Sequence, residues 1–549
     1  MRLANLGLCL GWLMLVGVRP AVTGDSLESR LPPGGFRDIA WQDPFPGKWR
    51  TVDVTQKGIA PNAGDVTARL QALVNGLTEP TILYFPPGTY RFGKITISKG
   101  NVILKGAGPK QTVFHPMTDG TILCWWGAGG RYEYAKLGPE YQPRQVTADV
   151  PPGATVVPVA DTKDLRPGDM VMVEEDLDKW SYGDARRSRG GVFLITRVEG
   201  NQITLDLPLA LGLDQVQPDK KNAIVAKLKP VCNVGIEGVR IAMPEERGSK
   251  TSTLFFKRVY NAYVRNVESY NPSRHHVEIC YARQVVVEGC FFDEAKDKGD
   301  GGYGYGVNLR DLSTLCKVEN CIFRDLRHTL ATETGASYCI FAYNLDVDRL
   351  RDLAHSPNAP TQCRDQGWLN NRQRNGVTSG FVTAEVVAHG NFPHNILLEG
   401  NVFYIACVDR SHTTNGPHFL FRNCALGQPK LYGWWQEGCG IVVMGENDNQ
   451  AVVGNALRND SAILLQKHQD PRTSQNTLIA GNVVKAQVEW GPLPSETKLP
   501  PSLYLKDRPP FWPRDMAWPP FGPDVAVSAP AKIPAQLRYE AQYKPGEKE

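Results

Sequence analysis

A short phrase recurs along the chain: apolar residues, often with a Glu or Arg, then Gly or Asn, then more apolar residues. It reads IEGVRI from Ile236, YVRNV from Tyr263, VVEGC from Val286 and LLEGNV from Leu397. Nine copies, each marked by one central residue, stand at positions 238, 266, 289, 320, 343, 400, 423, 454 and 481. The markers are 23 to 31 residues apart, with one gap of 57 residues. A repeat of this length predicts a solenoid, in which each unit packs against its neighbours.

The repeats have strand character, because β-branched runs such as Val285–Val287 and Ile441–Val443 are too short for helices. Gly and Asn tolerate left-handed backbone, so each phrase is expected to end in a tight turn. We therefore predict an all-β chain that folds as a parallel β-helix, with coils stacked about 4.8 Å apart. Asn residues at equivalent places are expected to form an internal amide ladder. These are Asn266, Asn320, Asn401, Asn423, Asn455 and Asn482.

The first 24 residues have the features of a secretory signal peptide, with Arg2, an apolar stretch over Leu6–Val18 and small residues before Asp25. No other stretch is apolar enough to span a bilayer. The rest of the chain has 59 basic and 57 acidic residues, a balance that argues against a nucleic-acid partner. We therefore expect a secreted or periplasmic protein. Its oligomeric state is left open, as is any pairing among the eleven cysteines outside the signal.

The sequence divides into four parts after the signal. Residues 25–144 are expected to form an N-terminal cap and the first coils, and residues 145–212 a small inserted antiparallel β-module with hairpin signals. Residues 213–489 form the main β-helix, and the Pro-rich tail 490–549 is expected to strap or cap it. In the long gap between markers, residues 350–380 are predicted to be a loop at the mouth of a site.

One stretch resembles a known superfamily. A predicted short helix over Val66–Leu77 precedes TILYFPPGTYRFG and ITISKGNVILKGAG. This order resembles the opening module of the pectate-lyase-like superfamily, in which a helix caps the first coil and a strand ending in PxGxY begins the β-helix. The match covers about residues 50–115, and the repeats extend it to about residue 485. The resemblance implies a right-handed parallel β-helix, but it says little about the reaction because one fold hosts many chemistries.

Polar residues recur at fixed offsets from the markers and predict two columns on the surface of the helix. One column contains Arg274, Asp297, Arg327, His328 and Arg410, and the other contains Glu278, Asn308, Glu333, His389 and His412. Eight of the ten histidines lie between His275 and His418. Because histidine titrates near neutral pH, this cluster favours a functional site over chance surface positions.

The densest segment runs from Asp300 to Glu333. Tyr303 and Tyr305 stand between glycines, which allow a backbone to approach a ligand closely. We predict Tyr305, Arg327, His328, His389 and His412 as catalytic candidates. The predicted substrate-binding residues are Arg274, His275, Asp297, Asp300, Tyr303, Asn308, Glu333, His394, Arg410 and His418. The same stretch resembles a group of exported bacterial β-helix proteins that repeat GYGV, RH and HG…PHN motifs, a group with no firm shared activity.

No cofactor and no metal site is predicted. The spacings between His389 and His394 and between His412 and His418 could serve a metal, but no Cys or acidic ligand stands at a fixed distance. The chain also lacks the catalytic motifs of its better-known relatives. The polygalacturonase Asn-Thr-Asp, Asp-Asp, Gly-His-Gly and Arg-Ile-Lys motifs are absent, as are the Trp-x-Asp-His and Arg-x-Pro-x-x-Arg motifs of calcium-dependent pectate lyases.

The leading hypothesis is a polysaccharide-degrading enzyme. For a lyase acting on a uronate polymer by β-elimination, His328 or His389 would be the base, Arg327 or Arg410 would neutralise the carboxylate, and Tyr305 would be the acid. For a glycoside hydrolase, the available carboxyls are Asp297, Asp300, Glu333 and Asp409. The richness in Arg, His and Tyr slightly favours elimination. An epimerase and a non-enzymatic glycan-binding adhesin remain the alternatives.

Overall fold

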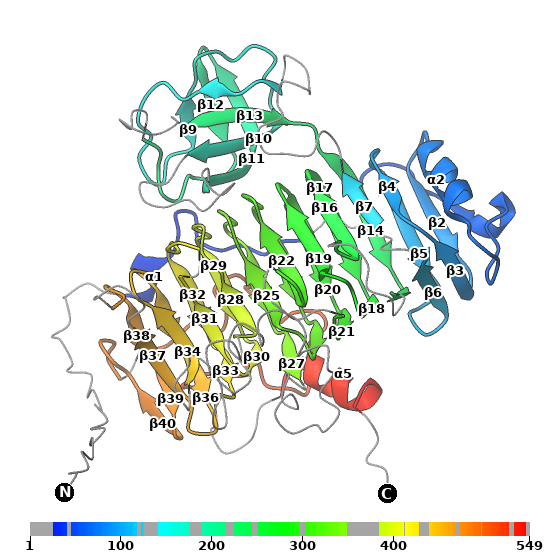
Figure 1. Ribbon diagram of the computed structural model, residues 1–549. Helices are drawn as coiled ribbons and strands as arrows, with labels where there is room; N and C mark the ends of the chain where they lie inside the picture. Colours follow the sequence, from blue (N-terminus) through cyan, green and yellow to red (C-terminus); the bar gives the residue numbers. More distant parts are fainter. Residues whose placement is uncertain are drawn as a thin grey trace, which may run out of the picture.

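The computed structural model describes residues 26–40, 45–117, 122–125, 141–175, 188–214, 223–243, 251–296, 302–347, 384–410, 412–427, 439–466, 473–495, 497–525 and 532–544. Three long sheets wind around a common axis, so the predicted parallel β-helix is confirmed (Figure 1). Each full coil contributes one strand to each sheet. We call the sheets A, B and C in the order in which the chain visits them. The predicted signal peptide lies outside the described residues.

Sheet A has twelve strands: β1 (Arg50–Asp53), β2 (Thr81–Phe85), β5 (Val102–Gly106), β14 (Val231–Glu237), β17 (Val259–Arg265), β20 (Arg283–Glu288), β23 (Lys317–Glu319), β26 (Ile340–Ala342), β29 (Ile396–Glu399), β32 (His418–Phe421), β35 (Ala451–Val453) and β38 (Leu478–Ala480). Sheet B has β3 (Gly88–Phe92), β6 (Thr112–Pro116), β15 (Arg240–Ala242), β18 (Glu268–Tyr270), β21 (Phe291–Asp293), β24 (Ile322–Arg324), β27 (Leu345–Val347), β30 (Val402–Phe403), β33 (Cys424–Ala425), β36 (Ala456–Leu457), β39 (Asn482–Val484) and the antiparallel β40 (Gln487–Glu489).

Sheet C has ten strands: β4 (Ile95–Ile97), β7 (Ile122–Trp125), β16 (Leu254–Lys257), β19 (His275–Cys280), β22 (Tyr305–Arg310), β25 (His328–Thr332), β28 (Val386–Ala388), β31 (Ala406–Val408), β34 (Cys439–Met444) and β37 (Ala462–Gln466). The helices are α1 (Leu27–Arg30), the 3-10 helix η1 (Val54–Lys57), α2 (Thr67–Asn75) and α5 (Pro534–Gln542). The predicted cap helix over Val66–Leu77 is α2, and the strand–turn–strand after it is β2 and β3. Of the helices in the described ranges, none is both long and apolar enough to cross a membrane.

The repeated phrase is the turn from sheet A to sheet B. Eight of its nine markers have a φ between 50° and 70°, and for the marker at 423 the left-handed residue is the preceding Arg422. The residue after each left-handed position points into the coil. There the amides of Asn344, Asn401, Asn423, Asn455 and Asn482 donate to one another in series at 2.9–3.0 Å.

The predicted amide ladder therefore exists, but its membership differs from the prediction at three residues. Asn266 and Asn320 occupy the left-handed turn position itself, so their side chains are one place away from the ladder. Asn344, which was not predicted, is a member. At the equivalent place in earlier coils stand Cys290 and Cys321, both buried, and the Cys321 amide donates to the Asn344 side chain at 2.9 Å.

A six-stranded antiparallel sheet interrupts the coils between sheet C strand β7 and sheet A strand β14. Its strands are β8 (Arg144–Gln145), β9 (Val156–Pro158), β10 (Met170–Glu175), β11 (Arg189–Glu199), β12 (Gln202–Leu205) and β13 (Ile224–Leu228). The sheet thus extends past residue 212, where the inserted module was expected to end. Figure 1 shows it beside the coils rather than within their stack. It is fixed there by the buried Arg283, which donates to the Val192 carbonyl at 2.6 Å and pairs with Asp206.

Two chain ends run lengthwise over sheets A and B. We call residues 26–40 and 45–49 the N-terminal strap and residues 497–525 and 532–544 the C-terminal strap. The N-terminal strap begins at the last coils, where Arg30 donates to the Asn476 carbonyl at 2.6 Å, and Phe45 reaches Tyr263 near the first coils. The C-terminal strap also contacts coils that are far apart. Its Asp524 accepts from Arg422, and its Tyr543 donates to Glu268. Their apolar side chains share a core cluster with the outer residues of sheets A and B.

Candidate functional site

Three aromatic side chains stand in register at the beginning of neighbouring strands of sheet C. His275 of β19, Tyr305 of β22 and His328 of β25 are paired across parallel strands. The His275 and Tyr305 rings are stacked, with centroids 4.7 Å apart and planes 12° apart. The Tyr305 ring meets the His328 ring edge-on at 4.7 Å. The fold therefore places these three predicted site residues in direct contact.

Two further histidines extend this arrangement from the far end of the strands. His389 follows β28, and its ring centroid is 5.6 Å from that of His328 and 4.6 Å from that of His412. The small side chains of Ala331 and Val387 lie in one cluster with Tyr305, which leaves room for rings from both strand ends to approach. We call His275, Tyr305, His328, His389 and His412 the aromatic row.

The proton on His328 is placed by a backbone carbonyl. Its Nδ1 lies 2.6 Å from the carbonyl oxygen of Ala384, which can only accept, so Nδ1 carries the proton. Burial lowers the pKa of His328 well below its usual value, and the nearby Arg327 and His389 lower it further. The ring is therefore neutral near pH 7, with a lone pair on Nε2. Within the described part of the chain, Nε2 is buried and has no hydrogen-bond partner, so its lone pair is not used by another protein group there.

His389 has the opposite character. Its Nδ1 lies 2.6 Å from Oδ2 of Asp409, the residue that follows β31. Burial alone would lower the pKa of His389, but the charge and the hydrogen bond of Asp409 raise it above the usual value. The Asp409 carboxylate thus favours the imidazolium form, which can donate a proton through Nε2. Two neighbouring histidines are therefore tuned in opposite directions.

A cluster of charges lies beside the row on β19 and β22. Oε1 of Glu278 is 3.6 Å from Arg274 and 3.5 Å from Arg310, and Ser252 donates to Oε2 at 2.6 Å. Burial alone would raise the pKa of Glu278, but His275, Arg274 and Arg310 together lower it to about 2. Its carboxyl is therefore ionised at any physiological pH.

Glu333 is held ionised in the same way. Burial again opposes ionisation, yet the charge of Arg310 gives Glu333 a lowered pKa. Asn308, from the middle of β22, donates to Oε1 of Glu333 at 3.0 Å. The predicted binding residues Asn308 and Glu333 therefore form one contact beside the row.

The glycine-flanked segment before Tyr305 is held from both sides. His275 donates from Nε2 to the Gly302 carbonyl at 2.7 Å, and the Gly304 amide donates to the Arg274 carbonyl at 2.9 Å. The Arg327 amide in turn donates to the Gly304 carbonyl at 2.9 Å. Tyr303 lies within this clamped segment, half-buried. Arg274 and His275 thus hold the loop that presents Tyr305, and His275 is fully buried beneath that ring.

The two predicted carboxylate-neutralising arginines lie in different places. The Arg327 guanidinium is 5.9 Å from the centre of the Tyr305 ring, beside the row. Arg410 follows Asp409 and forms an ion pair with Glu446. Burial raises the pKa of Tyr305 far above its usual value, although Arg327 opposes this, so its hydroxyl remains protonated. Arg327 is therefore the cation next to the reactive groups.

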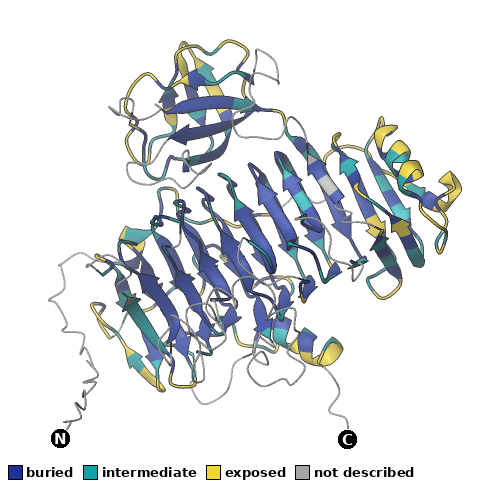
Figure 2. Cartoon of the chain, viewed as in Figure 1, coloured by how far each residue is buried: buried dark blue, intermediate teal, exposed yellow. Residues whose placement is uncertain are grey.

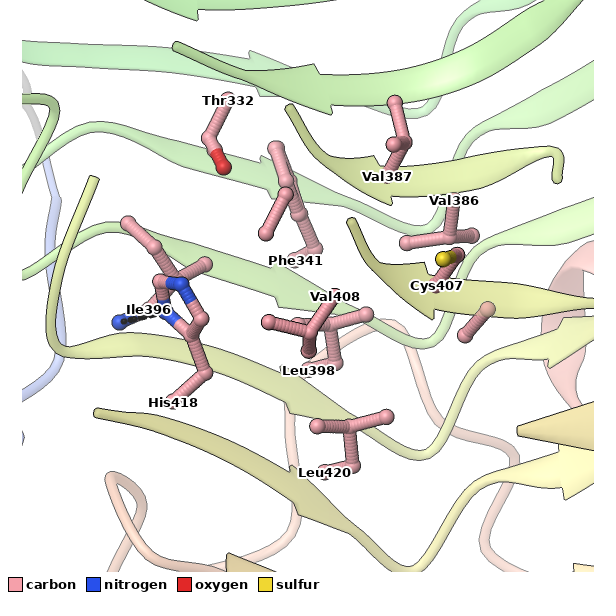
Figure 3. Close-up of a pocket in the computed structure, with 12 residues that line it drawn as sticks. Thr332, Phe341, Val386, Val387, Ile396, Leu398, Cys407, Val408, His418 and Leu420 are labelled. Carbon is pink, nitrogen blue, oxygen red and sulfur yellow. Dashed lines mark hydrogen bonds between the residues drawn. The ribbon is translucent and has the colours of Figure 1, made fainter. Parts of the chain in front are cut away.

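Four predicted residues lie outside this arrangement or outside the described residues. His418 begins β32 of sheet A and lines a cavity inside the coils with aliphatic side chains (Figure 3). Its burial lowers its pKa to about 3. His394 is also buried, and its pKa is lowered to about 4. Asp297 and Asp300, like the predicted loop at 350–380, lie outside the described residues.

Sequence reasoning missed the groups that set the protonation of the row. The Ala384 carbonyl is a backbone atom, and no sequence pattern marks it. Asp409 was considered only as a hydrolytic carboxyl, whereas the register that pairs Ala388 with Val408 brings it beside His389. Aligning β28 with β31 by their apolar residues would have found that contact. No group of three or more His, Cys, Asp or Glu in the described ranges is arranged to hold a metal ion.

Comparison with known proteins supports the fold alone. No protein-family model and no curated protein matches the sequence. The tailspike gp61 of Pseudomonas phage phi297 has a TM-score of 0.53 at 13% identity, over 84% of this chain and 75% of the tailspike. The Gp54 tailspike of Acinetobacter baumannii bacteriophage AP22, solved in complex with a capsular saccharide, has a TM-score of 0.39 at 11% identity, over 78% and 73%.

A third similar structure is the A-module of the mannuronan C-5 epimerase AlgE4 from Azotobacter vinelandii, with a TM-score of 0.37 at 12% identity, over 79% of this chain and 96% of the module. The architecture is a right-handed parallel β-helix, the fold that the resemblance of the opening module implied.

Proposed function

We propose that this right-handed β-helix protein is an exported lyase that cleaves a uronate-containing polysaccharide by β-elimination at the aromatic row. The observation that carries the proposal is the pair of neighbouring histidines with opposite protonation. His328 offers a lone pair on Nε2, and His389 is held towards the imidazolium form by Asp409. An elimination requires a base to remove a proton and an acid to protonate the leaving oxygen.

The proposed step is a β-elimination in which His328 accepts one proton and the leaving oxygen receives another. Nε2 of His328 removes the proton from the carbon that bears the uronate carboxylate. The electrons of that C–H bond form a carbon–carbon double bond, and the neighbouring C–O bond to the next sugar breaks. The departing oxygen takes a proton from Nε2 of His389, with the protonated Tyr305 hydroxyl as the alternative donor. Arg327 neutralises the carboxylate and so stabilises the negative charge that develops on it.

A glycoside hydrolase on the same site is less favoured. Hydrolysis uses two carboxyls, one of which has a raised pKa and protonates the leaving oxygen. Glu278 and Glu333 beside the row both have lowered pKa values. Glu399, whose pKa burial raises to about 7, lies on sheet A, where Leu503 of the C-terminal strap donates to it. The charged side chains beside the row therefore favour proton abstraction over acid-assisted hydrolysis.

Polysaccharide assays test the reaction. Purified protein is incubated with polygalacturonate, polymannuronate, polyglucuronate, hyaluronan and a neutral glucan, while ultraviolet absorbance and reducing ends are followed. We expect absorbance from the new double bond on at least one acidic polymer and none on the neutral glucan. New reducing ends without absorbance would indicate a hydrolase. A changed uronate stereochemistry without cleavage would indicate an epimerase, and binding without any of these changes an adhesin.

The His328→Gln variant tests the assigned base. Gln is close in size and can donate to the Ala384 carbonyl, but it has no basic nitrogen, so turnover should fall by about a hundredfold or more. His115→Gln is the matched control, because His115 lies on β6, far along the chain from the row. Both variants should keep the far-ultraviolet dichroism and melting temperature of the parent. A fully active His328→Gln enzyme would refute the assignment.

A further inference from the structure

The outer face of sheet C carries a line of residues that follows the helix axis past the aromatic row. We call it the outer line. By strand register it consists of Phe255, Glu278, Asn308, Ala331, Val387, Cys407 and Val442. A polymer that lies along the axis, as in an open groove, would pass over these positions. Their exposure therefore shows whether a long chain could lie across the site.

The inserted sheet covers the end of the outer line that lies towards the first coils. Phe255 packs in one cluster with Met170 and Met172 of β10 and Leu228 of β13. The same cluster contains Cys280, which follows Glu278 on β19. The insertion therefore occupies the face on which a sugar chain would have to continue beyond His275 and Glu278.

The opposite side is closed as well. Cys407 and Val442 belong to a buried apolar cluster with Met444, and their exposed fractions are 3%, 0% and 8%. Apolar residues without accessible surface offer no hydrogen bonds to sugar hydroxyls. Between the two clusters, the outer line carries polar side chains only at Glu278 and Asn308, on the neighbouring strands β19 and β22.

The reactive groups are themselves deeply set between these two ends. His275, Tyr305 and His328 have exposed fractions of 0%, 1% and 3%, so a polymer that passes over the outer face does not contact them directly. Figure 2 shows the strands of this region as almost uniformly buried. The half-buried polar residues lie before the start or after the end of the strands of sheet C. They are Arg274, Tyr303, Glu333 and His412.

From this enclosure we propose that the site receives the end of a glycan chain and not an internal segment, so that the enzyme is exo-acting. The inference rests on the proposed function for its chemistry, but on the packing of the insertion and of the apolar cluster for its geometry. The substrate class is accordingly terminal uronate residues or short oligouronates.

Chain-length dependence of the rate tests the inference. The acidic polymer that is turned over is shortened by partial acid hydrolysis, and samples of different mean length are compared at equal mass. An end-acting enzyme should become faster by the same factor as the chains become shorter, because the concentration of ends rises by that factor. Viscosity should fall slowly relative to absorbance. A rate independent of length, with an early collapse of viscosity, would overturn the inference and leave the proposed reaction standing.

Binding stoichiometry separates the inference from the reaction. His328→Gln protein is titrated by calorimetry into length-fractionated samples of each of the four acidic polymers, with the neutral glucan as the control ligand. End recognition predicts a constant number of proteins bound per chain at every length. A number that rises with chain length would overturn the inference. A constant number without turnover by the parent protein would support end recognition while refuting the lyase, and no binding to any of the four polymers would refute both.

Discussion

At the scale of single residues, the site depends on how two similar side chains are made different. His328 and His389 are both buried, so burial alone would lower the pKa of both. The difference comes from one partner each: a neutral carbonyl for His328 and a carboxylate for His389. A carboxylate stabilises the imidazolium through its charge, whereas the neutral carbonyl selects a tautomer and raises the pKa of His328 too little to offset burial. The division of labour between base and acid therefore depends on Asp409.

This dependence predicts a specific pH effect. In the proposed reaction the acidic limb of kcat/KM reports protonation of His328, and the alkaline limb reports loss of the proton from His389. Asp409→Asn removes the charge that raises the pKa of His389, so the alkaline limb should move to lower pH while the acidic limb stays. The measurement is a pH–rate profile of both proteins on the acidic polymer.

The control for that profile is Asp460→Asn, the same change at an exposed turn, which should leave both limbs in place. An unmoved alkaline limb in Asp409→Asn would show that His389 is not the group whose deprotonation ends activity. A uniform loss of rate with unchanged limbs would mean that Asp409 acts only by holding its neighbour in position.

At the scale of the elements, the turn between sheets A and B combines two adjacent positions with different demands. The first has left-handed backbone and is filled by Gly, Asn, Tyr or Arg, and the second points an amide into the coil. Asn423 illustrates the second position. Its amide donates to Asn455 and to the Leu398 carbonyl, and its oxygen accepts from Asn401. Each amide in the ladder thus satisfies groups in both neighbouring coils.

Interrupting the ladder should be costly. Asn423→Ala leaves the donors of Asn401 and the Leu398 carbonyl buried without partners, so we expect a loss of about 3 kcal/mol or more in the free energy of unfolding. Asn201→Ala, at an exposed hairpin position, should change stability by about 0.5 kcal/mol at most. Urea unfolding followed by dichroism measures both. Equal effects of the two substitutions would contradict a structural role for the ladder.

The elements were largely predictable, and the contacts between distant segments were not. The left-handed turns follow from local chemistry, because Gly and Asn tolerate that backbone, so the repeated phrase located them to within one residue. The same uncertainty of one residue misassigned Asn266 and Asn320. Columns at fixed offsets identified His328, since coil stacking repeats positions, and the flanking glycines identified Tyr305. The Ala384 carbonyl and the packing of Met170 near Cys280 depend on tertiary placement, which leaves no local pattern.

At the scale of the whole molecule, the two straps connect coils that are not adjacent in the solenoid. A repeat protein is normally held together by contacts between adjacent units only. Here Arg422, buried in a left-handed turn, donates to the carbonyls of Pro500, Leu499 and Phe521 and pairs with Asp524. One side chain thus fixes both ends of the extended part of the C-terminal strap to a single coil.

Removing this anchor should release the strap. Arg422→Met keeps the apolar stem but loses these hydrogen bonds, so we expect lower stability by about 3 kcal/mol or more and faster cleavage within residues 497–525 by a non-specific protease. Arg514→Ala, an exposed arginine of the same strap, is the matched control and should behave as the parent does. The measurements are thermal unfolding and limited proteolysis with mass spectrometry. Undiminished protease resistance in Arg422→Met would show that the aromatic contacts suffice.

The N-terminal strap has a consequence for the order in which this molecule is made. Arg30 binds Asn476, a residue 446 positions later in the chain. A solenoid that grows coil by coil could fold as it emerges, but this one cannot complete its first segment until its last coil exists. The N-terminal strap cannot form its contact with Asn476 until the last coils have folded. Contacts between residues so far apart in the sequence slow folding. Docking of the N-terminal strap therefore cannot be complete before the coil that contains Asn476 has formed.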